Sequence, residues 1–258
     1  MVSRRQLELV TAEVVECRAC PRLVEWRERV ARERVARFAD QEYWGRPVPG
    51  FGDPDARVLV LGLAPAAHGG NRTGRIFTGD RSGDFLTASL FRTGLANRPT
   101  SVRRGDGLRL RTAYVAAVNR CAPPDNRPTP QERDRCLPFL GREILALERL
   151  SVIVALGSFA WDGGLRALAA LGHVRRPKPR FGHGAETEVG SYVQIGSYHP
   201  SQQNTFTGRL TPEMLDAIFE RAIRIASVSP RRSAAVRTGP PGRGSAGGAG
   251  GDRARGSG

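Results

Sequence analysis

The sequence contains a single lysine, Lys178, although lysine and arginine together number 40. So few amines make it a poor candidate for chemistry that needs a Schiff base. Long apolar runs are also missing. No stretch approaches the roughly eighteen residues that a membrane-spanning helix needs, and no apolar segment follows the first five residues. We therefore expect a soluble, cytoplasmic protein with no membrane contact.

Acidic residues are outnumbered, which gives a formal net charge of +15. This sign suits a partner made of phosphates, but the heavy use of Arg, Ala and Gly also indicates a GC-rich coding sequence, which raises the charge for unrelated reasons. Residues 229–258 consist largely of Gly, Pro, Ser, Ala and Arg. We predict a disordered basic tail there, which either holds nonspecifically to DNA or is a dispensable extension. Residues 1–228 are then one folded domain.

Short apolar runs alternate with segments of helical period. The runs predict four buried strands: Arg57–Leu63, Ala113–Asn119, Val152–Leu156 and Tyr192–Gly196. The helical segments are Ser3–Arg34, Asp84–Leu95, Thr129–Leu147, Ser158–Leu171 and Thr211–Ala226. This alternation predicts an α/β domain of three layers, α/β/α, with a central four-stranded, mostly parallel sheet. Ligands of such sheets bind beyond the carboxyl ends of the strands, and three of these ends carry unusual residues: 64–80, 119–128 and 197–201.

The four cysteines are arranged as two distant pairs, Cys17-x2-Cys20 and Cys121-x14-Cys136. A cytoplasmic chain seldom uses disulfides, so a metal or cluster site is the favoured interpretation, and four unrelated buried thiols are the alternative. The spacing does not choose between zinc and an iron–sulfur cluster. Such a site would tie the N-terminal helix to the loop after the second strand.

Several motifs in order resemble the family 5, or B-type, uracil-DNA glycosylases, and the resemblance runs from Cys17 to Ala226. They are GLAPAAHG at 62–69, NRTGR at 71–75, FTGD at 77–80, NRCAPP at 119–124 with NRP at 126–128, and HPS at 199–201. The resemblance implies that all four cysteines hold a [4Fe-4S] cluster. It also implies a monomeric, nucleoid-associated enzyme of base excision repair that flips a base out of DNA and hydrolyses its N-glycosidic bond.

The resemblance also implies roles for single residues. Phe77 would stack on the flipped base and Asn119 would hydrogen-bond its Watson–Crick edge. His199 would donate to O2 of the leaving base, and Ser201 would contact a DNA phosphate. The ordinary alternatives are a core aromatic for Phe77, a turn residue for Asn119 and a structural imidazole for His199.

The carboxylate that would activate water or stabilise the sugar is harder to assign. Ala64 stands where the best-known uracil glycosylases carry an acidic residue. The resemblance points instead to Asp80 as general base or oxocarbenium stabiliser, with Asp84 in reserve and a helix cap as the ordinary role of Asp80. The resemblance implies that hydroxymethyluracil, ethenocytosine and hypoxanthine are accepted besides uracil, as they are by B-type members as a group. The small residues Ala64, Ala66 and Ala67 would leave a roomier pocket for them.

The sequence bears on four alternatives to this activity. Lys178 lies in a basic loop away from every motif, so we expect a monofunctional enzyme that leaves an abasic site. No Arg-Ile-His insertion is present, which argues against the covalent trapping seen in a related family. A damaged-DNA binding module without catalysis is the main alternative. A nucleotide hydrolase built on Gly69–Gly74 lacks the Gly-Lys-Ser/Thr of a phosphate-binding loop.

Overall fold

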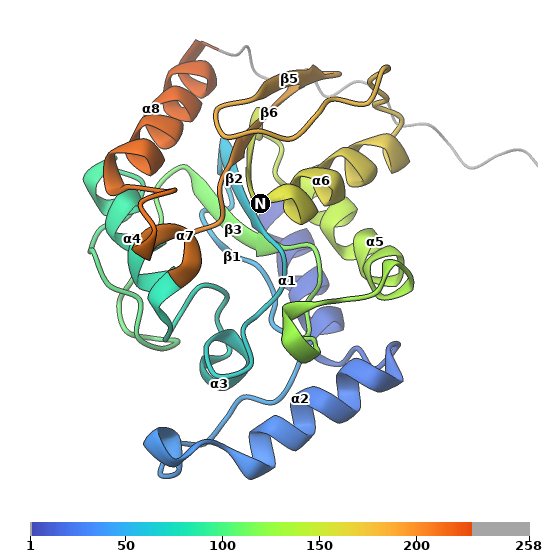
Figure 1. Ribbon diagram of the computed structural model, residues 1–258. Helices are drawn as coiled ribbons and strands as arrows, with labels where there is room; N and C mark the ends of the chain where they lie inside the picture. Colours follow the sequence, from blue (N-terminus) through green and yellow to red (C-terminus); the bar gives the residue numbers. More distant parts are fainter. Residues whose placement is uncertain (1, 229–258) are drawn as a thin grey trace, which may run out of the picture.

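The computed structural model describes residues 2–228, so the predicted basic tail at 229–258 lies outside the described residues (Figure 1). Its centre is one sheet with the strand order β1-β3-β2-β4-β6-β5. The strands are β1 (Phe51–Gly52), β2 (Val58–Gly62), β3 (Ala113–Ala117), β4 (Val152–Leu156), β5 (Glu186–Val189) and β6 (Tyr192–Ser197). Strands β3, β2, β4 and β6 are mutually parallel and coincide with the four predicted runs.

The α/β fold class is confirmed, but the sheet has six strands rather than four. The two additional strands lie at the edges and pair antiparallel, β1 with β3 and β5 with β6. Strand β1 is two residues long, and β5 reads Glu-Thr-Glu-Val with two exposed positions. Neither carries the apolar run of a buried strand, because one face of an edge strand meets solvent.

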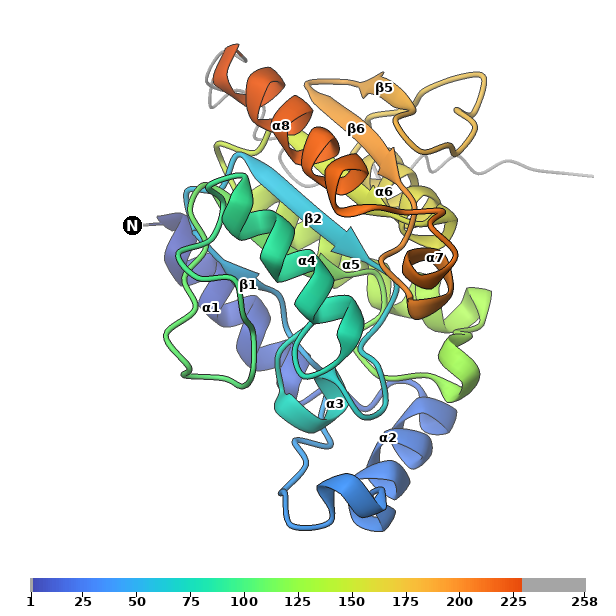
Figure 2. The ribbon, with the colours of Figure 1, turned by 60° about the vertical axis from the view of Figure 1, so that its left-hand side comes forward.

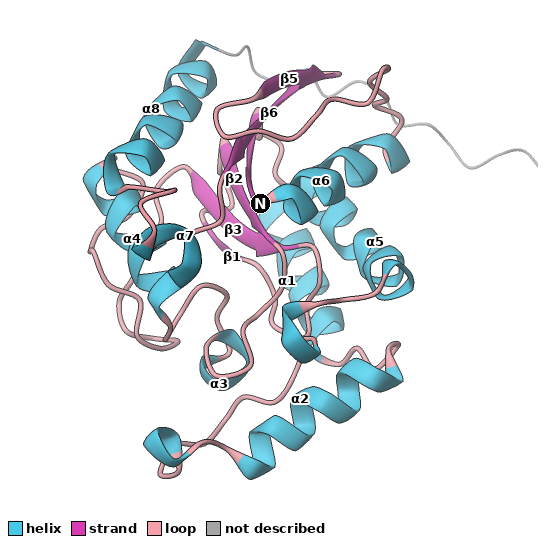
Figure 3. Cartoon of the chain, in the orientation of Figure 1, coloured by secondary structure: helices cyan, strands magenta, loops and turns pink. Residues whose placement is uncertain are grey.

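Helices cover both faces of the sheet (Figures 2 and 3). One face packs against α4 (Arg81–Arg92) and α8 (Pro212–Val228), and the other against α1 (Val2–Val15), α5 (Pro130–Ala146) and α6 (Ser158–Ala170). Strand β2 explains the layering, because its side chains alternate: Val58 and Val60 join the core with α4 and α8, whereas Leu59 and Leu61 join the other core. All four are buried, and each such side chain stabilises the fold by roughly 1.5–3 kcal/mol.

The opening helical segment is two helices, not one. Helix α1 ends at Val15, and α2 (Pro21–Glu33) begins at a proline, which suits the first turn of a helix because it lacks a backbone N–H. The first cysteine pair lies in the break between them. Helix α2 contacts α3 (Gly70–Thr73) at one end of the molecule (Figure 1).

The described residues also contain three further short helices: η1 (Ala36–Phe38), η2 (Pro124–Asn126) and α7 (Gln202–Phe206). None of the helices within residues 2–228 combines the length and apolar character that crossing a bilayer requires.

Candidate functional site

Strands β2 and β3 end side by side, which brings their following loops together. The N–H of Asn119 donates to the carbonyl of Leu63 at 2.9 Å, one step beyond the paired residues Gly62 and Ala117. Asn119 lies two residues beyond the end of β3, and it also lines the pocket that the four cysteines share. The loops after the two strands are therefore adjacent at this edge of the sheet.

Phe77 packs directly on the end of β2. A Cβ atom at Gly62 would lie 2.6 Å from ring carbon Cε2 of Phe77, so only glycine leaves room for this ring. The backbone of Phe77 has φ +49°, an unusual value for an aromatic residue. Its ring centroid is 5.9 Å from that of His199, with the planes inclined by 34°. The structure thus brings together the predicted stacking residue and the predicted donor.

Arg75 braces the loop that presents Phe77. Its guanidinium donates to both carboxylate oxygens of Asp106, at 2.9 and 2.6 Å, and to the hydroxyls of Ser101 and Thr78 at 2.8 and 3.0 Å. Burial opposes ionisation of Asp106, but the hydrogen bonds from Arg75 and from backbone amides hold its pKa well below the usual value. Arg75 belongs to the NRTGR motif, but the sequence gives no sign of its partner Asp106, because the two residues are 31 positions apart in the chain.

Asp80 is the N-cap of α4, the ordinary role considered for it. Its Oδ1 accepts the N–H of Gly83 at 2.8 Å, and its Oδ2 occupies the space that a side chain at Gly69 would need. Burial raises the pKa of Asp80, and the nearby charge of Asp84 adds to this effect. Asp84 is exposed on the first turn of α4. Oδ2 of Asp80 thus faces Gly69 in the loop after β2, while the backbone N–H groups of Gly83 and Ser82 both hydrogen-bond the carboxylate.

The three alanines of that loop, Ala64, Ala66 and Ala67, are half-buried. The carbonyl of Ala66 accepts the N–H groups of Gly69 and Asn71, at 3.2 and 3.0 Å, which closes the turn leading into α3. Ala66 thus lies close to Gly69, against which Asp80 packs. Ala64 directly follows Leu63, whose carbonyl is bonded to Asn119.

The amide of Asn119 is completely buried and unpaired. Neither Nδ2 nor Oδ1 has a hydrogen-bond partner among the described residues, and the exposed fraction of the residue is 0%. A buried polar group without a partner is costly, so this amide indicates a ligand that both accepts and donates hydrogen bonds.

The loop after β6 holds His199. Its carbonyl accepts from the side-chain Nδ2 of Asn204 and from the N–H of Ser201, both at 2.8 Å. Desolvation lowers the pKa of His199 to about 4, so its imidazole is neutral at pH 7 and carries one N–H. Ser201 caps α7: its Oγ accepts the N–H of Asn204 at 3.4 Å, which leaves its hydroxyl proton for another acceptor.

One aromatic pair beside this loop was missed in the sequence. The ring of His183 stacks on Tyr198 at 5.0 Å, and its Nδ1 accepts the N–H of Tyr198 at 3.2 Å. The guanidinium of Arg209 lies 4.5 Å from the centroid of the Tyr198 ring. These residues steady the backbone immediately before His199. No short-range signal marks His183, because it reaches Tyr198 across a long turn.

Lys178 is not part of the strand-end region. Its Nζ pairs with a carboxylate oxygen of Asp162 on α6 at 2.8 Å, and both side chains are exposed. Exposed pairs of this kind contribute little to stability.

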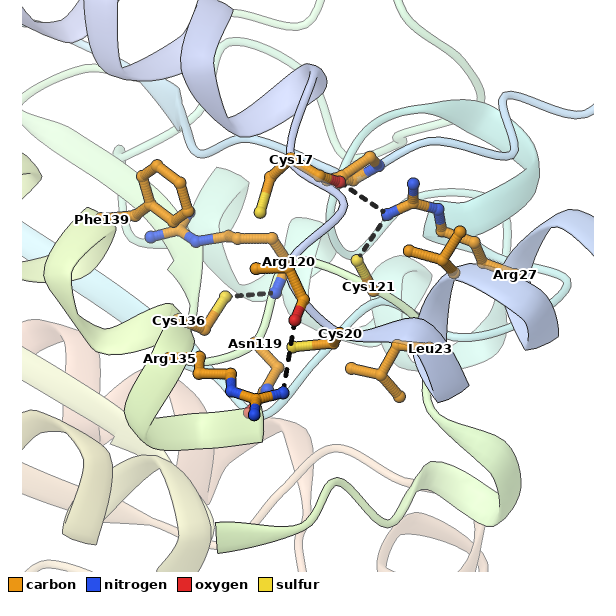
Figure 4. A pocket seen from close by; sticks show the side chains of 13 residues that line it. Cys17, Cys20, Leu23, Arg27, Asn119, Arg120, Cys121, Arg135, Cys136 and Phe139 are labelled. Carbon is orange, nitrogen blue, oxygen red and sulfur yellow. Dashed lines mark hydrogen bonds between the residues drawn. The ribbon is translucent and has the colours of Figure 1, made fainter. Parts of the chain in front are cut away.

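The four cysteines gather although they come from three parts of the chain. None of them forms a disulfide. All four line one pocket, and their sulfur atoms surround a common space (Figure 4). The four are Cys17, Cys20, Cys121 and Cys136. Two nitrogen donors reach these sulfurs. Nη1 of Arg27 lies 2.9 Å from Cys121 Sγ, and the N–H of Arg120 lies 3.3 Å from Cys136 Sγ.

The donor chemistry of this pocket, four cysteine sulfurs, is used both by zinc ions and by iron–sulfur clusters. Within residues 2–228, no group of three or more His, Cys, Asp or Glu side chains is arranged so that it could hold a metal ion. Burial raises the pKa of Cys121 to about 11 and that of Cys136 to about 12, so both are thiols until a cation displaces the protons.

The strand ends present an aromatic ring, an unpaired amide and a neutral imidazole, which are the groups that a protein needs to hold an extruded base. The family model of the uracil DNA glycosylase superfamily matches residues 49–223. A type-5 uracil-DNA glycosylase of Mycobacterium tuberculosis is 58% identical over 221 residues, which are 85% of this chain and 81% of that protein. One from Thermus thermophilus is 48% identical over 222 residues, 86% and 99% of the two chains.

A type-4 uracil-DNA glycosylase of Thermotoga maritima is more distant, at 34% identity over 162 residues, 62% of this chain and 67% of that protein. The chain belongs to the uracil-DNA glycosylase superfamily and, within it, to the type-5 group.

Proposed function

We propose that this chain excises uracil from DNA by hydrolysing its N-glycosidic bond and leaves an abasic site. The observation that carries the proposal is the buried, unpaired amide of Asn119. Uracil offers an acceptor oxygen and a donor N–H next to each other, and one carboxamide satisfies both. Binding the base would give both polar atoms of the Asn119 amide a hydrogen-bond partner and so offset the free-energy cost of burying them.

Phe77 and His199 complete the base site in this proposal. The ring of Phe77 would stack on the flipped base, and the close approach to Gly62 fixes where that ring lies. Bond breaking leaves negative charge on the base, and the N–H of a neutral His199 would stabilise it as a hydrogen-bond donor. A desolvated site strengthens this interaction, because little water competes for the charge.

Asp80 would act at the sugar. Its Oδ2 faces Gly69 in the loop after β2, where it would stabilise the oxocarbenium carbon or take a proton from water. Asp84 stays in reserve, but its exposed position on α4 suits this role less well. The remaining hydroxyl proton of Ser201 would bind a DNA phosphate.

The cysteine site supports a structural [4Fe-4S] cluster held by Cys17, Cys20, Cys121 and Cys136. The bound cluster would cross-link the α1–α2 junction, the loop after β3 and helix α5. It would thereby fix α2, which contacts α3 in the loop that leads to Phe77.

We further propose that the enzyme is monofunctional, monomeric and broad in substrate range. The only lysine is engaged in an exposed ion pair, so no amine is offered to the sugar. The small side chains of Ala64 and Ala66 leave room for hydroxymethyluracil, ethenocytosine and hypoxanthine as well as uracil.

The test uses an oligonucleotide with one uracil, either single-stranded or opposite guanine, incubated without magnesium and then treated with alkali. Alkali-dependent breaks are expected from the wild-type chain, with none before alkali. They should be lost in Asn119→Ala and kept in Gln6→Ala, a control that changes an exposed amide on α1. Tight binding without breaks, from cluster-loaded protein, would instead establish the binding-module alternative.

A further inference from the structure

A buried arginine stands among the cysteines without a buried counter-ion. Arg27 on α2 is 2% exposed, and its Nη1 donates to Cys121 Sγ at 2.9 Å and to the carbonyl of Cys17 at 3.3 Å (Figure 4). Its Nε is buried and has no hydrogen-bond partner among the described residues. The guanidinium is therefore directed at the pocket of sulfur atoms.

No carboxylate in the described part of the chain neutralises Arg27 in the interior. Glu28 comes within 3.7 Å of Nη2, but its side chain is 32% exposed and it accepts both hydrogen bonds of Arg18, at 2.5 and 3.2 Å. The second buried arginine of this pocket differs. Arg120 is 1% exposed and makes a two-pronged pair with Glu143, at 3.1 and 2.5 Å, whose side chain is equally buried.

A buried charge is tolerated only when an opposite charge balances it. Four cysteine thiolates around an iron–sulfur core supply this charge, because the whole assembly carries net negative charge. Arg27 lies directly against this pocket, with Nη1 2.9 Å from Cys121 Sγ, whereas its nearest carboxylate, that of Glu28, is partly exposed and bonded to Arg18. A loaded site would therefore give the buried guanidinium an opposite charge in the interior.

We propose that Arg27 is the buried counter-ion of the cysteine-bound cluster and sets both its retention and its reduction potential. This inference rests on the proposed cluster and does not depend on uracil excision. An added electron makes the cluster more negative, and a nearby positive charge with an N–H···S hydrogen bond stabilises that form. Arg27 consequently raises the reduction potential.

The experiment compares full-length chains reconstituted with iron and sulfide under anaerobic conditions. Iron and sulfide content is measured first, then the half-life of the cluster absorbance in a chelator, and then the one-electron reduction potential at an electrode. Arg27→Gln removes the charge but keeps N–H donors, whereas Arg27→Lys keeps the charge. Arg29→Met on the same helix is the matched control, because Arg29 is 43% exposed.

Arg27→Gln is expected to lower the potential and to shorten the cluster half-life several-fold, with Arg27→Lys nearer to the wild type and Arg29→Met unchanged. A folded Arg27→Gln protein with wild-type potential and half-life would overturn the proposal. Where the glutamine variant does not fold, Arg27→Lys decides. A folded lysine variant that loads the cluster supports the charge account, and one that loads none overturns it.

The outcomes separate this inference from the proposed activity. A wild-type chain that binds zinc, or neither iron nor sulfide, overturns the role of Arg27, and uracil excision is then judged by its own assay. Potentials that shift as expected in a chain that releases no uracil support the role of Arg27 and refute the activity alone.

Discussion

At the scale of single residues, the unpaired amide of Asn119 lowers the stability of the fold. The amide of Asn119 is buried without partners, so Asn119→Ala removes an unsatisfied polar group. We predict that the free energy of unfolding is unchanged or rises by about 1–3 kcal/mol, while single-turnover excision falls by at least about 100-fold. Urea denaturation and single-turnover kinetics measure the two effects. A variant that loses stability but keeps its rate would show that the amide serves packing.

Protonation of Asp80, and not of His199, should set the fall of the single-turnover rate at acidic pH. Desolvation lowers the pKa of His199 to about 4, so this imidazole stays neutral through the range from pH 8 to pH 5. Burial raises the pKa of Asp80, so its carboxylate takes up a proton as the pH falls, at a pH above the ordinary aspartate value.

We predict that the single-turnover rate falls with decreasing pH in one step that Asp80→Asn abolishes, together with most of the rate. Asp84→Asn is the matched control and should keep the step. A step near pH 6.5 that vanishes in His199→Gln would contradict the assignment, because it would require an ordinary histidine pKa.

Gly62 is required by the ring of Phe77. A Cβ atom there would lie 2.6 Å from the ring, so Gly62→Ala should displace it and destabilise the protein by roughly 1–3 kcal/mol. The free energy of binding uracil-DNA should fall by more than the free energy of unfolding does, because the displaced ring no longer stacks on the base. Gly141→Ala in α5 is the control, because the nearest atom to its new Cβ is 3.8 Å away, and it should stabilise the helix by about 0.5–1 kcal/mol. Thermal unfolding and uracil-DNA titration would test both. Equal affinities for the two variants would count against stacking by Phe77.

At the scale of elements, α2 is linked to the loop that carries Phe77 and Asp80. The buried Asn71 donates from Nδ2 to the carbonyl of Arg27 at 3.2 Å, and Arg72 donates to the carbonyl of Gly79 at 2.8 Å. Asn71→Ala leaves the cysteines in place but breaks this link. We predict faster hydrogen exchange over residues 72–80, with iron content unchanged and unfolding free energy lower by about 1–3 kcal/mol. Unchanged exchange would mean that the loop is held by its own contacts alone.

The helices and strands that the sequence predicted are those with a clear apolar run or a clear helical spacing of apolar residues. The four central strands were found because both of their faces are buried, which requires continuous apolar runs. The edge strands β1 and β5 and the short helices α3 and α7 lack such runs, so their formation depends on neighbours distant in the chain. The break at Cys17–Cys20 was missed because helical spacing continues on both sides of it.

At the scale of the whole molecule, the location of the site was more predictable than its geometry. The rule that ligands bind at the carboxyl ends of parallel strands selected the loops of Phe77, Asn119 and His199, and the structure places the rings of Phe77 and His199 5.9 Å apart. The supports of the site, such as Arg75 with Asp106, join residues 31 positions apart. No local pattern encodes a pairing over that distance, so only the folded chain reveals it.

The most direct test of the central claim is the identification of the released product. Cluster-loaded protein is incubated with uracil-containing DNA, and the free base and the intact abasic strand are quantified by mass spectrometry. The account predicts one free uracil for each abasic site, no strand cleavage before alkali, and no release by Asn119→Ala. Stable binding of uracil-DNA without free uracil would contradict it and would make this chain a damage-binding protein.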